Sequence, residues 1–289
     1  MKNLLFVIFI ILFVSILGCV KSDTNNQDEL ESKEDTSMKD RVAQIKESTV
    51  RILVNGHPVG TGFIVSKKGL IATCFHVVQH VQATANGQTQ ITHATNIEAE
   101  FNDGTKSPAT VYKSCQNQGF RESLSRDYAI LVVKPHKDLV PLVLGTFADA
   151  EEGAEVYICG FPFDLNTPFV SKGILSTKTT TPGYLGEGSD RDAALLDITL
   201  NKGNSGGPVV LIGKTPQDDK VIGIATFTLS PLSPPLAQLA DRVQKFPGNV
   251  HIMGIDFKQF SILIKNTFEA NSVGIGGCIS VDYMKNHVD

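Results

Sequence analysis

The chain has 289 residues, a formal net charge of −4 and 42% hydrophobic residues. This length allows one large or two small domains, and the hydrophobic content is sufficient for a packed core. Because positive charge is not gathered into a basic stripe, a nucleic-acid partner is not expected. The 25 glycines and 13 prolines, together with frequent valine, isoleucine and threonine, favour a β-rich fold.

The first residues have the composition of an export signal. Lys2 precedes an apolar run over residues 4–17, which is shorter than the roughly 20 residues of a membrane-spanning helix. The end of this run, Ser15 to Cys19, resembles the bacterial lipoprotein signal. The resemblance implies removal of residues 1–18, lipidation of Cys19 and export to the bacterial cell envelope, on the periplasmic or cell-surface side of a membrane. An uncleaved anchor and an ordinary secreted form are the alternatives.

Residues 19–36 are mostly polar and acidic and contain too few apolar side chains to form a core, so we expect a flexible tether. The pattern from Ser37 to Asp40 is typical of a capped helix start. Apolar residues then recur with helical spacing, which predicts a short helix that ends near Glu47.

Strand patterns dominate the next segment. Apolar and polar residues alternate over 50–54, and Asn55-Gly56 is typical of a tight hairpin turn, so residues 59–65 are predicted to form the return strand. A third strand, residues 70–73, leads directly to His76.

Two segments around these strands carry a family resemblance. Gly60–Val65 and Leu70–Val78 resemble the first-barrel motif of trypsin-like serine proteases, in particular the bacterial HtrA-type group. The resemblance places His76 at the position of the catalytic histidine. A zinc site formed by His76 and His80 on one helix is the alternative, but no third ligand accompanies them. We therefore expect no metal and no cofactor.

An aspartate stands immediately before a strongly apolar strand. Asp127 precedes Tyr128–Val133, and this segment resembles the D-x-A-(I/L)-L signature of the same proteases. The resemblance implies that Asp127 is the acid of a catalytic triad. Asp192 and Asp197 are weaker candidates, because neither precedes such a strand.

Ser205 lies in a glycine-rich segment that is followed by a proline and a β-branched run. Such a turn can present a hydroxyl and direct several amides at one point. Gly203–Gly207 formally matches the G-x-S-x-G elbow of α/β-hydrolases, but that elbow requires a helix after the serine, and Asp and His later in the chain. Here both precede the serine, which is the order of trypsin-like proteases, so an esterase of the α/β type is disfavoured.

The resemblance assigns roles to these residues. It implies that Ser205 is the nucleophile, that His76 is its base and that Asp127 orients His76. The oxyanion hole is expected at Gly203, Asn204 and Ser205, with the amides of Gly203 and Ser205 as donors. The residues expected to bind substrate are Thr199, Lys202, Ile222, Gly223 and Ile224. Because Thr199 is uncharged, we expect a small or medium apolar side chain in the primary specificity pocket.

The resemblance implies an all-β fold with two six-stranded antiparallel barrels of the chymotrypsin type, an N-terminal helix and a C-terminal helix. The first barrel and its helix are predicted in residues 37–150, and the second barrel and its helix in 151–269. The last strand is expected over 250–255, followed by a helix that begins at Asp256. Residues 270–289 are expected to be a tail, which is too short for a PDZ domain.

Four cysteines remain besides Cys19, and they allow three pairings. One disulfide or none is expected among Cys74, Cys115, Cys159 and Cys278. The sequence as a whole predicts a lipid-anchored serine endopeptidase that acts on protein or peptide substrates, with a role in protein quality control. A proteolytically silent binding or chaperone module with the same fold is the alternative. The sequence carries no indication of an oligomeric state.

Overall fold

The computed structural model describes residues 38–83, 89–118, 126–135, 137–181, 191–228, 234–248, 251–252, 254–270 and 274–288. The predicted signal peptide, the lipidation site Cys19 and the tether lie outside these residues.

The chain divides into two compact units, Met1–Ala43 and Gln44–Asp289. Only residues 38–43 of the first unit are described, and they are helical. The helix continues into the second unit and ends at Glu47, as the sequence predicts.

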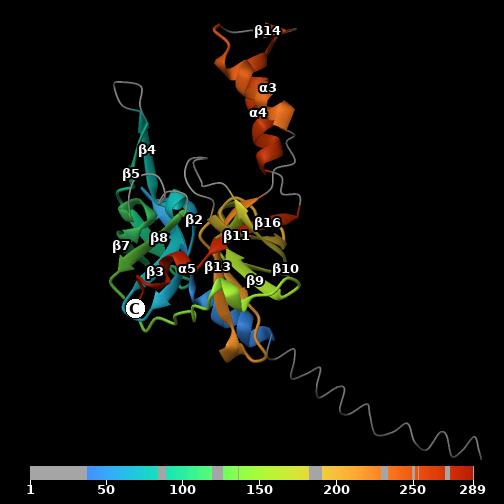
Figure 1. The fold of residues 1–289 in the computed structure, drawn as a ribbon. Helices are drawn as coiled ribbons and strands as arrows, with labels where there is room; N and C mark the ends of the chain where they lie inside the picture. The colour runs from blue at the N-terminus through green and yellow to red at the C-terminus, as the bar shows by residue number, and fades with distance from the viewer. Residues whose placement is uncertain are drawn as a thin grey trace, which may run out of the picture. The chain divides into compact units, whose positions relative to one another are not determined.

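A closed six-stranded barrel forms the first half of the larger unit, with the strand order β1-β2-β3-β8-β7-β6 (Figure 1). The strands are β1 (Thr49–Val54), β2 (His57–Ser66), β3 (Leu70–Cys74), β6 (Ile97–Glu100), β7 (Lys106–Ser114) and β8 (Tyr128–Val133). Asn55 and Gly56 have φ angles of 53° and 78°, the left-handed conformations that a tight hairpin turn between β1 and β2 requires. A separate two-stranded sheet pairs β4 (Gln79–Ala83) with β5 (Thr89–His93).

The second half is another closed barrel, with the order β10-β11-β16-β13-β12-β9. Its strands are β9 (Glu155–Gly160), β10 (Phe169–Thr181), β11 (Arg191–Asp197), β12 (Pro208–Leu211), β13 (Lys220–Thr228) and β16 (Ile275–Ser280). The alternating apolar residues of both barrels point inward, and Ile52, Phe63 and Val209 are 0% exposed. The prediction of two six-stranded antiparallel barrels is therefore confirmed.

The predicted boundary of the second barrel is wrong, because the segment called a tail contains β16. This strand pairs with β11 through Leu195↔Gly277 and with β13 through Ile224↔Ile279, and thereby closes the barrel. A short helix, α5 (Asp282–Lys285), follows it. The predicted last strand over 250–255 instead contains parts of a small pair, β14 (His251–Ile252) and β15 (Ile255–Asp256), outside both barrels.

Two helices are inserted in the chain between β13 and β16. They are α3 (Pro234–Lys245) and α4 (Phe257–Ala270), and they contact one another. The predicted helix beginning near Asp256 is thus present as α4, but it precedes the last strand instead of ending the fold. Within the described parts of the chain, no helix is long and apolar enough to cross a membrane.

Candidate active site

His76 and Asp127 are brought together by the pairing of two neighbouring strands. β3 leads into a one-turn 3-10 helix, η1 (Phe75–Val77), while Asp127 directly precedes β8. Because Cys74 of β3 lies opposite Tyr128 of β8, the residues just beyond these positions meet at one end of the barrel. Asp127 has a φ angle of 46°, a strained conformation for a non-glycine residue that is typical of functional sites.

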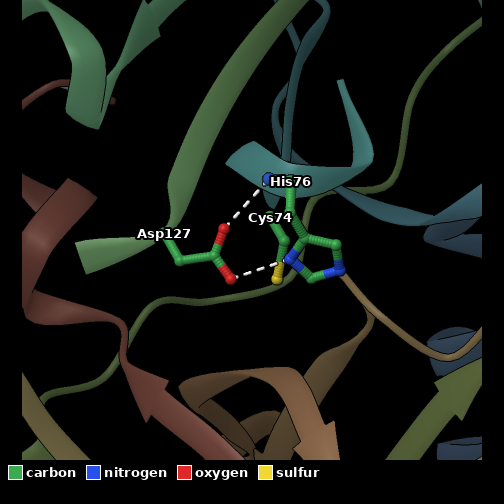
Figure 2. Close-up of side chains that lie close together, drawn as sticks. All are labelled: Cys74, His76 and Asp127. Carbon is green, nitrogen blue, oxygen red and sulfur yellow. Dashed lines mark hydrogen bonds and ion pairs between the residues drawn. The ribbon is translucent and has the colours of Figure 1, made fainter. Parts of the chain in front are cut away.

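The Asp127 carboxylate is completely buried and receives three hydrogen bonds (Figure 2 shows the two from His76). The backbone amide of His76 donates to one oxygen at 2.9 Å, and the ring Nδ1 of His76 lies 2.8 Å from the other. The hydroxyl of Thr226, on β13 of the second barrel, donates to that second oxygen at 2.6 Å. The charge is therefore buried with its hydrogen-bonding capacity largely satisfied.

The pair perturbs the pKa of both groups. Burial by itself disfavours the charged form of His76, but the charge of Asp127 and its hydrogen bond raise the pKa of His76 well above its ordinary value. Burial likewise opposes ionisation of Asp127, yet the charge of His76 and the hydrogen bonds lower the pKa of the carboxyl. Because the carboxylate accepts the hydrogen bond from Nδ1, the neutral ring carries its proton there and keeps Nε2 as an acceptor.

The loop that carries Ser205 is fixed against both barrels. The carbonyl oxygen of Ser205 accepts a hydrogen bond from the amide of Thr61 on β2 at 2.8 Å. The next amide, that of Gly206, donates to the carbonyl of Ala225 on β13 at 2.8 Å, and the thiol of Cys74 donates to the same carbonyl at 3.3 Å. A Cβ on Gly60 would lie 2.9 Å from the carbonyl oxygen of Ser205 and 2.8 Å from the side chain of Val77, so the serine loop lies close to η1.

Two amides of the serine loop are left available. Among the described residues, no acceptor is hydrogen-bonded to the amide of Gly203 or of Ser205, although both carbonyls are engaged by Thr61. Gly203 has a φ angle of 102°, and a Cβ there would lie 2.2 Å from the carbonyl oxygen of Phe161. Only glycine is compatible with this position.

Asn204, the third residue of the predicted oxyanion hole, is buried. It is 5% exposed, and its side-chain Oδ1 has no hydrogen-bond partner among the described residues. Its backbone amide donates to the carbonyl of Asn201 at 3.0 Å, so this amide is not directed at a substrate. The two free amides of the loop are those of its neighbours, Gly203 and Ser205.

A second tight turn, η5 (Pro162–Asp164), is hydrogen-bonded to the serine loop. The amide of Phe163 donates to the carbonyl of Lys202 at 2.9 Å, directly before Gly203. Phe163 and Asp164 have φ angles of 54° and 59°, and left-handed conformations cost about 1–2 kcal/mol for each non-glycine residue. The turn therefore requires external contacts to hold it.

Arg51 of β1 supplies these contacts across the junction of the barrels. Its Nη1 donates to the carbonyl of Leu165 at 3.2 Å and to the side chain of Asn166 at 2.9 Å. Its Nε and Nη2 donate to Glu100, the Nε bond being 2.8 Å long. Because Arg51 is only 9% exposed, this fork of hydrogen bonds is largely shielded from water and rigid.

Thr199 lies in an open groove of about 580 Å³. The groove is lined by Phe169, Val170, Ser171, Lys172, Asp197, Ile198, Thr199, Asn201 and Gly274. Five of these residues are polar or charged, three are apolar and one is glycine, so the groove can offer both hydrogen-bonding and apolar contacts. The side chain of Lys202, which we also expect to bind substrate, is exposed beside the serine loop.

The predicted substrate-pairing role of Ile222, Gly223 and Ile224 conflicts with the structure. The side chains of Ile222 and Ile224 are 0% exposed. Gly223 pairs with Val209 on one side and with Ser280 on the other, so both edges of β13 are occupied there. A substrate backbone has no free hydrogen-bonding groups to pair with at these residues.

Comparison with known proteins agrees with this geometry. Residues 60–224 match the family model of the trypsin-like peptidase domain. The chain belongs to the trypsin-like peptidase family. Serine protease HTRA3 of Mus musculus is 35% identical over 188 residues, which cover 65% of this chain and 36% of that protein. Serine protease HTRA4 of Homo sapiens is 32% identical over 203 residues, covering 70% of this chain and 37% of that protein.

Solved structures share the fold. HtrA-type protease AlgW with tripeptide superposes with a TM-score of 0.56 at 21% identity, covering 85% of this chain and 60% of that chain. An inactive form of Rv3671c from M. tuberculosis H37Rv has a TM-score of 0.51 at 20% identity, covering 85% of this chain and 87% of that chain. The chain spans little more than a third of the curated relatives that it matches, 36% of HTRA3 and 37% of HTRA4.

Cys74 adds a third side chain with metal-binding capacity to the candidate site. Its thiol and the side chains of His76 and Asp127 place ligand atoms within 4.8 Å of one another (Figure 2). Burial and the charge of Asp127 raise the pKa of Cys74, whose thiol donates a hydrogen bond to the carbonyl of Ala225. His80 is exposed on β4 and is not part of this cluster.

None of the four cysteines is in a disulfide. Cys74, Cys115, Cys159 and Cys278 are all free and buried. Burial raises the pKa of Cys159 and of Cys278 to about 12, so both thiols pack as small apolar groups.

Thr226 and Arg51 are the site residues that the sequence does not reveal. Thr226 lies in an apolar strand where nothing marks its contact with Asp127. Arg51 occupies a polar position of an alternating strand, where a solvent-exposed side chain is the ordinary expectation. Both act through partners more than 95 residues away, since Thr226 contacts Asp127 and Arg51 contacts the turn around Asp164.

Replacing Asp127 with asparagine tests the electrostatics of the His76–Asp127 pair. Asp127→Asn removes the negative charge that raises the pKa of His76, so we expect the pKa of the histidine to fall. The measurement is an NMR titration of the His76 ring. Thr226→Val is the matched control, because it removes one hydrogen bond and leaves the charge, so its shift should be smaller. An unchanged His76 pKa in Asp127→Asn would contradict the proposed cause.

Replacing Arg51 with methionine tests the support of the serine loop. We expect Arg51→Met to slow the reaction of Ser205 with an active-site probe by about 10-fold, because a misplacement of about 1 Å costs up to 10²-fold. Rates are compared at a temperature where circular dichroism shows both proteins folded. Arg51→Lys keeps the charge but not the fork and should be intermediate. A folded Arg51→Met protein that reacts at the wild-type rate would rule out this role.

Proposed function

We propose that this protein is a serine endopeptidase in which Ser205, His76 and Asp127 form the catalytic triad. The proposal is supported chiefly by the buried His76–Asp127 hydrogen bond of 2.8 Å beside a serine loop fixed to both barrels. Membership of the trypsin-like peptidase family and similarity to proteins named as serine proteases support it further.

The proposed proton path runs from Ser205 through His76. A serine hydroxyl is a weak nucleophile at neutral pH and requires a base. With Nδ1 committed to Asp127, the Nε2 atom of His76 takes the proton of Ser205 as the hydroxyl attacks a peptide carbonyl. His76 then passes that proton to the leaving amine, and water hydrolyses the acyl-enzyme by the same steps. The buried Asp127 charge stabilises the imidazolium that forms in each step.

The amides of Gly203 and Ser205 hold the oxyanion. Both lack an acceptor among the described residues and belong to one tight loop. Donors fixed before the reaction stabilise developing charge without reorganisation, and loss of one donor typically costs about 10²–10³-fold in turnover. The turn at Phe163, fixed by Arg51, keeps the loop in this conformation.

The substrates are proteins or peptides, bound beside the groove that contains Thr199. Because Thr199 is uncharged and the apolar Phe169, Val170 and Ile198 also line the groove, we propose a small or medium apolar side chain at the primary specificity position. Asp197 and Lys172 lie in the same groove, but Lys172 is paired with Glu155 at 2.8 Å.

We also propose that the enzyme is exported and anchored to a membrane of the bacterial cell envelope by lipid on Cys19. An envelope location, together with similarity to HtrA-type proteases, is consistent with removal of unfolded or mislocalised proteins. The acidic tether of residues 19–36 would separate the anchor from the catalytic domain.

A fluorophosphonate probe tests the catalytic proposal. We expect covalent labelling of the wild-type chain, and at least about 10⁴-fold slower labelling in Ser205→Ala and His76→Ala, because triad residues act as a unit. Labelling is followed by mass spectrometry of the modified peptide. Cys74→Ala is the control for a neighbouring nucleophile, and in this variant the label should still be found on the peptide that contains Ser205. A folded wild-type protein that does not react would favour the silent binding module.

Lipidation of Cys19 is tested in bacterial cells. We expect the wild-type chain to incorporate labelled palmitate and to fractionate with membranes, whereas Cys19→Ser should incorporate none. The matched control is Cys115→Ser, which removes a buried cysteine far from the signal. Incorporation that persists in Cys19→Ser would refute this site.

A further inference from the structure

The α3–α4 hairpin is a feature that the proposed catalytic function does not use. It occupies the connection between β13 and β16, two adjacent strands that a short loop would join. Figure 1 shows α3 and α4 side by side, with the β14 strand at the far end of the hairpin. The tip is the region that contains the end of α3, β15 and the start of α4.

The two helices are joined by a polar contact. The side-chain amide of Gln244 on α3 donates to the carbonyl of Lys258 at 2.8 Å and to the hydroxyl of Ser261 at 2.6 Å. Ser261 is only 7% exposed, so this contact lies at the seam between the helices. The contact between the two helices is therefore at least partly polar.

Large apolar side chains of the hairpin are exposed. Leu239 is 55% exposed, and Phe246, which directly follows the end of α3, is 54% exposed. Ile255 and Phe260 are 54% and 42% exposed. Burying such surface stabilises by roughly 25 cal/mol per Å², and a cluster of this kind marks an interaction site.

An apolar hollow of about 250 Å³ lies within this cluster. Its floor is formed by Val243, Phe246 and Phe257, and it is flanked by Arg242 of α3 and Lys258 of α4. Neither cation is ion-paired among the described residues, and no acidic residue lines the hollow. The nearby carboxylate of Asp256 instead accepts the backbone amide of Lys258 at 2.9 Å.

We propose that the tip of the α3–α4 hairpin binds the surface of a phospholipid bilayer that contains anionic lipids. Apolar side chains flanked by Lys and Arg are the composition of segments that lie in the membrane interface. Phosphate groups would pair with Arg242, Lys245 and Lys258, while Phe246 and Ile255 enter the acyl boundary. The proposal does not depend on lipidation of Cys19 or on catalysis.

A second copy of this chain fits the tip less well than a bilayer does. In a symmetric dimer the same patch faces itself, so the flanking cations would lie opposite one another. Like charges placed across an interface are unfavourable, whereas an anionic surface is attracted.

The absence of tryptophan from the chain permits a position-specific test. Phe246→Trp places a single tryptophan at the tip, and Tyr112→Trp places one on β7 at a side chain that is 50% exposed. Each full-length variant is reconstituted into vesicles of phosphatidylcholine, with or without phosphatidylglycerol, and with or without brominated acyl chains. Both proteins should react normally with the fluorophosphonate probe, which shows that the barrels are folded.

We expect the emission of Phe246→Trp to move to shorter wavelength in phosphatidylglycerol vesicles and to be quenched by brominated lipid. The emission of Tyr112→Trp should stay unchanged, although any N-terminal anchor holds both variants on the same vesicles. Charge reversal of Arg242, Lys245 and Lys258 to glutamate should reduce quenching, since each cation contributes about fivefold to binding an anionic surface.

Three results would overturn the proposal. The first is a tip tryptophan that remains water-exposed in every vesicle. The second is emission already shifted in detergent without vesicles, which would show that the chain itself or a second copy covers the tip. The third is equal quenching with and without phosphatidylglycerol, which would remove the electrostatic basis of the interaction.

Discussion

The buried carboxylate of Asp127 is the constraint on which the site depends. Removing a charge from water costs several kcal/mol unless fixed donors replace the lost hydration. Two of its donors come from His76 in the first barrel, and the third is Thr226 in the second barrel. The charge is therefore fully compensated only when the two barrels are packed together. The same contact fixes the histidine ring, so stability of the junction and orientation of the proposed base have one cause.

The serine loop depends on the junction in a similar way. Thr61 of the first barrel bonds to the carbonyls of both Gly203 and Ser205, and Ala225 of the second barrel accepts the following amide. The strained turn at Phe163 adds a hydrogen bond to the carbonyl of Lys202 in this loop. Arg51 of the first barrel is hydrogen-bonded to the same turn. Strained backbone persists only where surrounding contacts determine it. The amides proposed to bind the oxyanion are thus set by a chain of contacts that crosses the junction twice.

The hairpin insertion would place the proposed membrane-binding tip outside the barrels that carry the proposed active site. It leaves the barrel after Thr228 and returns before Ile275, so barrel closure is preserved around it. Long insertions between adjacent strands cost little, because loop-closure entropy rises slowly with length. The proposed catalytic residues lie in the barrels and their junction, while the exposed apolar side chains of the proposed membrane-binding tip lie on the hairpin. A bilayer-bound tip would hold the domain at the membrane surface without altering the proposed active site.

The sequence by itself determined the local features of this protein. Alternation of apolar residues, the Asn55-Gly56 turn and the segments around His76, Asp127 and Ser205 predicted the barrels and the candidate site. It did not predict β16, because this glycine-rich segment lacks the alternating apolar pattern of a strand and pairs with Leu195, which is far away in the chain. Nor did it reveal Thr226, Arg51 or the occupied edges at Ile222–Ile224. These features are decided by strand pairing and buried hydrogen bonds between residues far apart in the chain, and such contacts exist only once both barrels have closed and packed together.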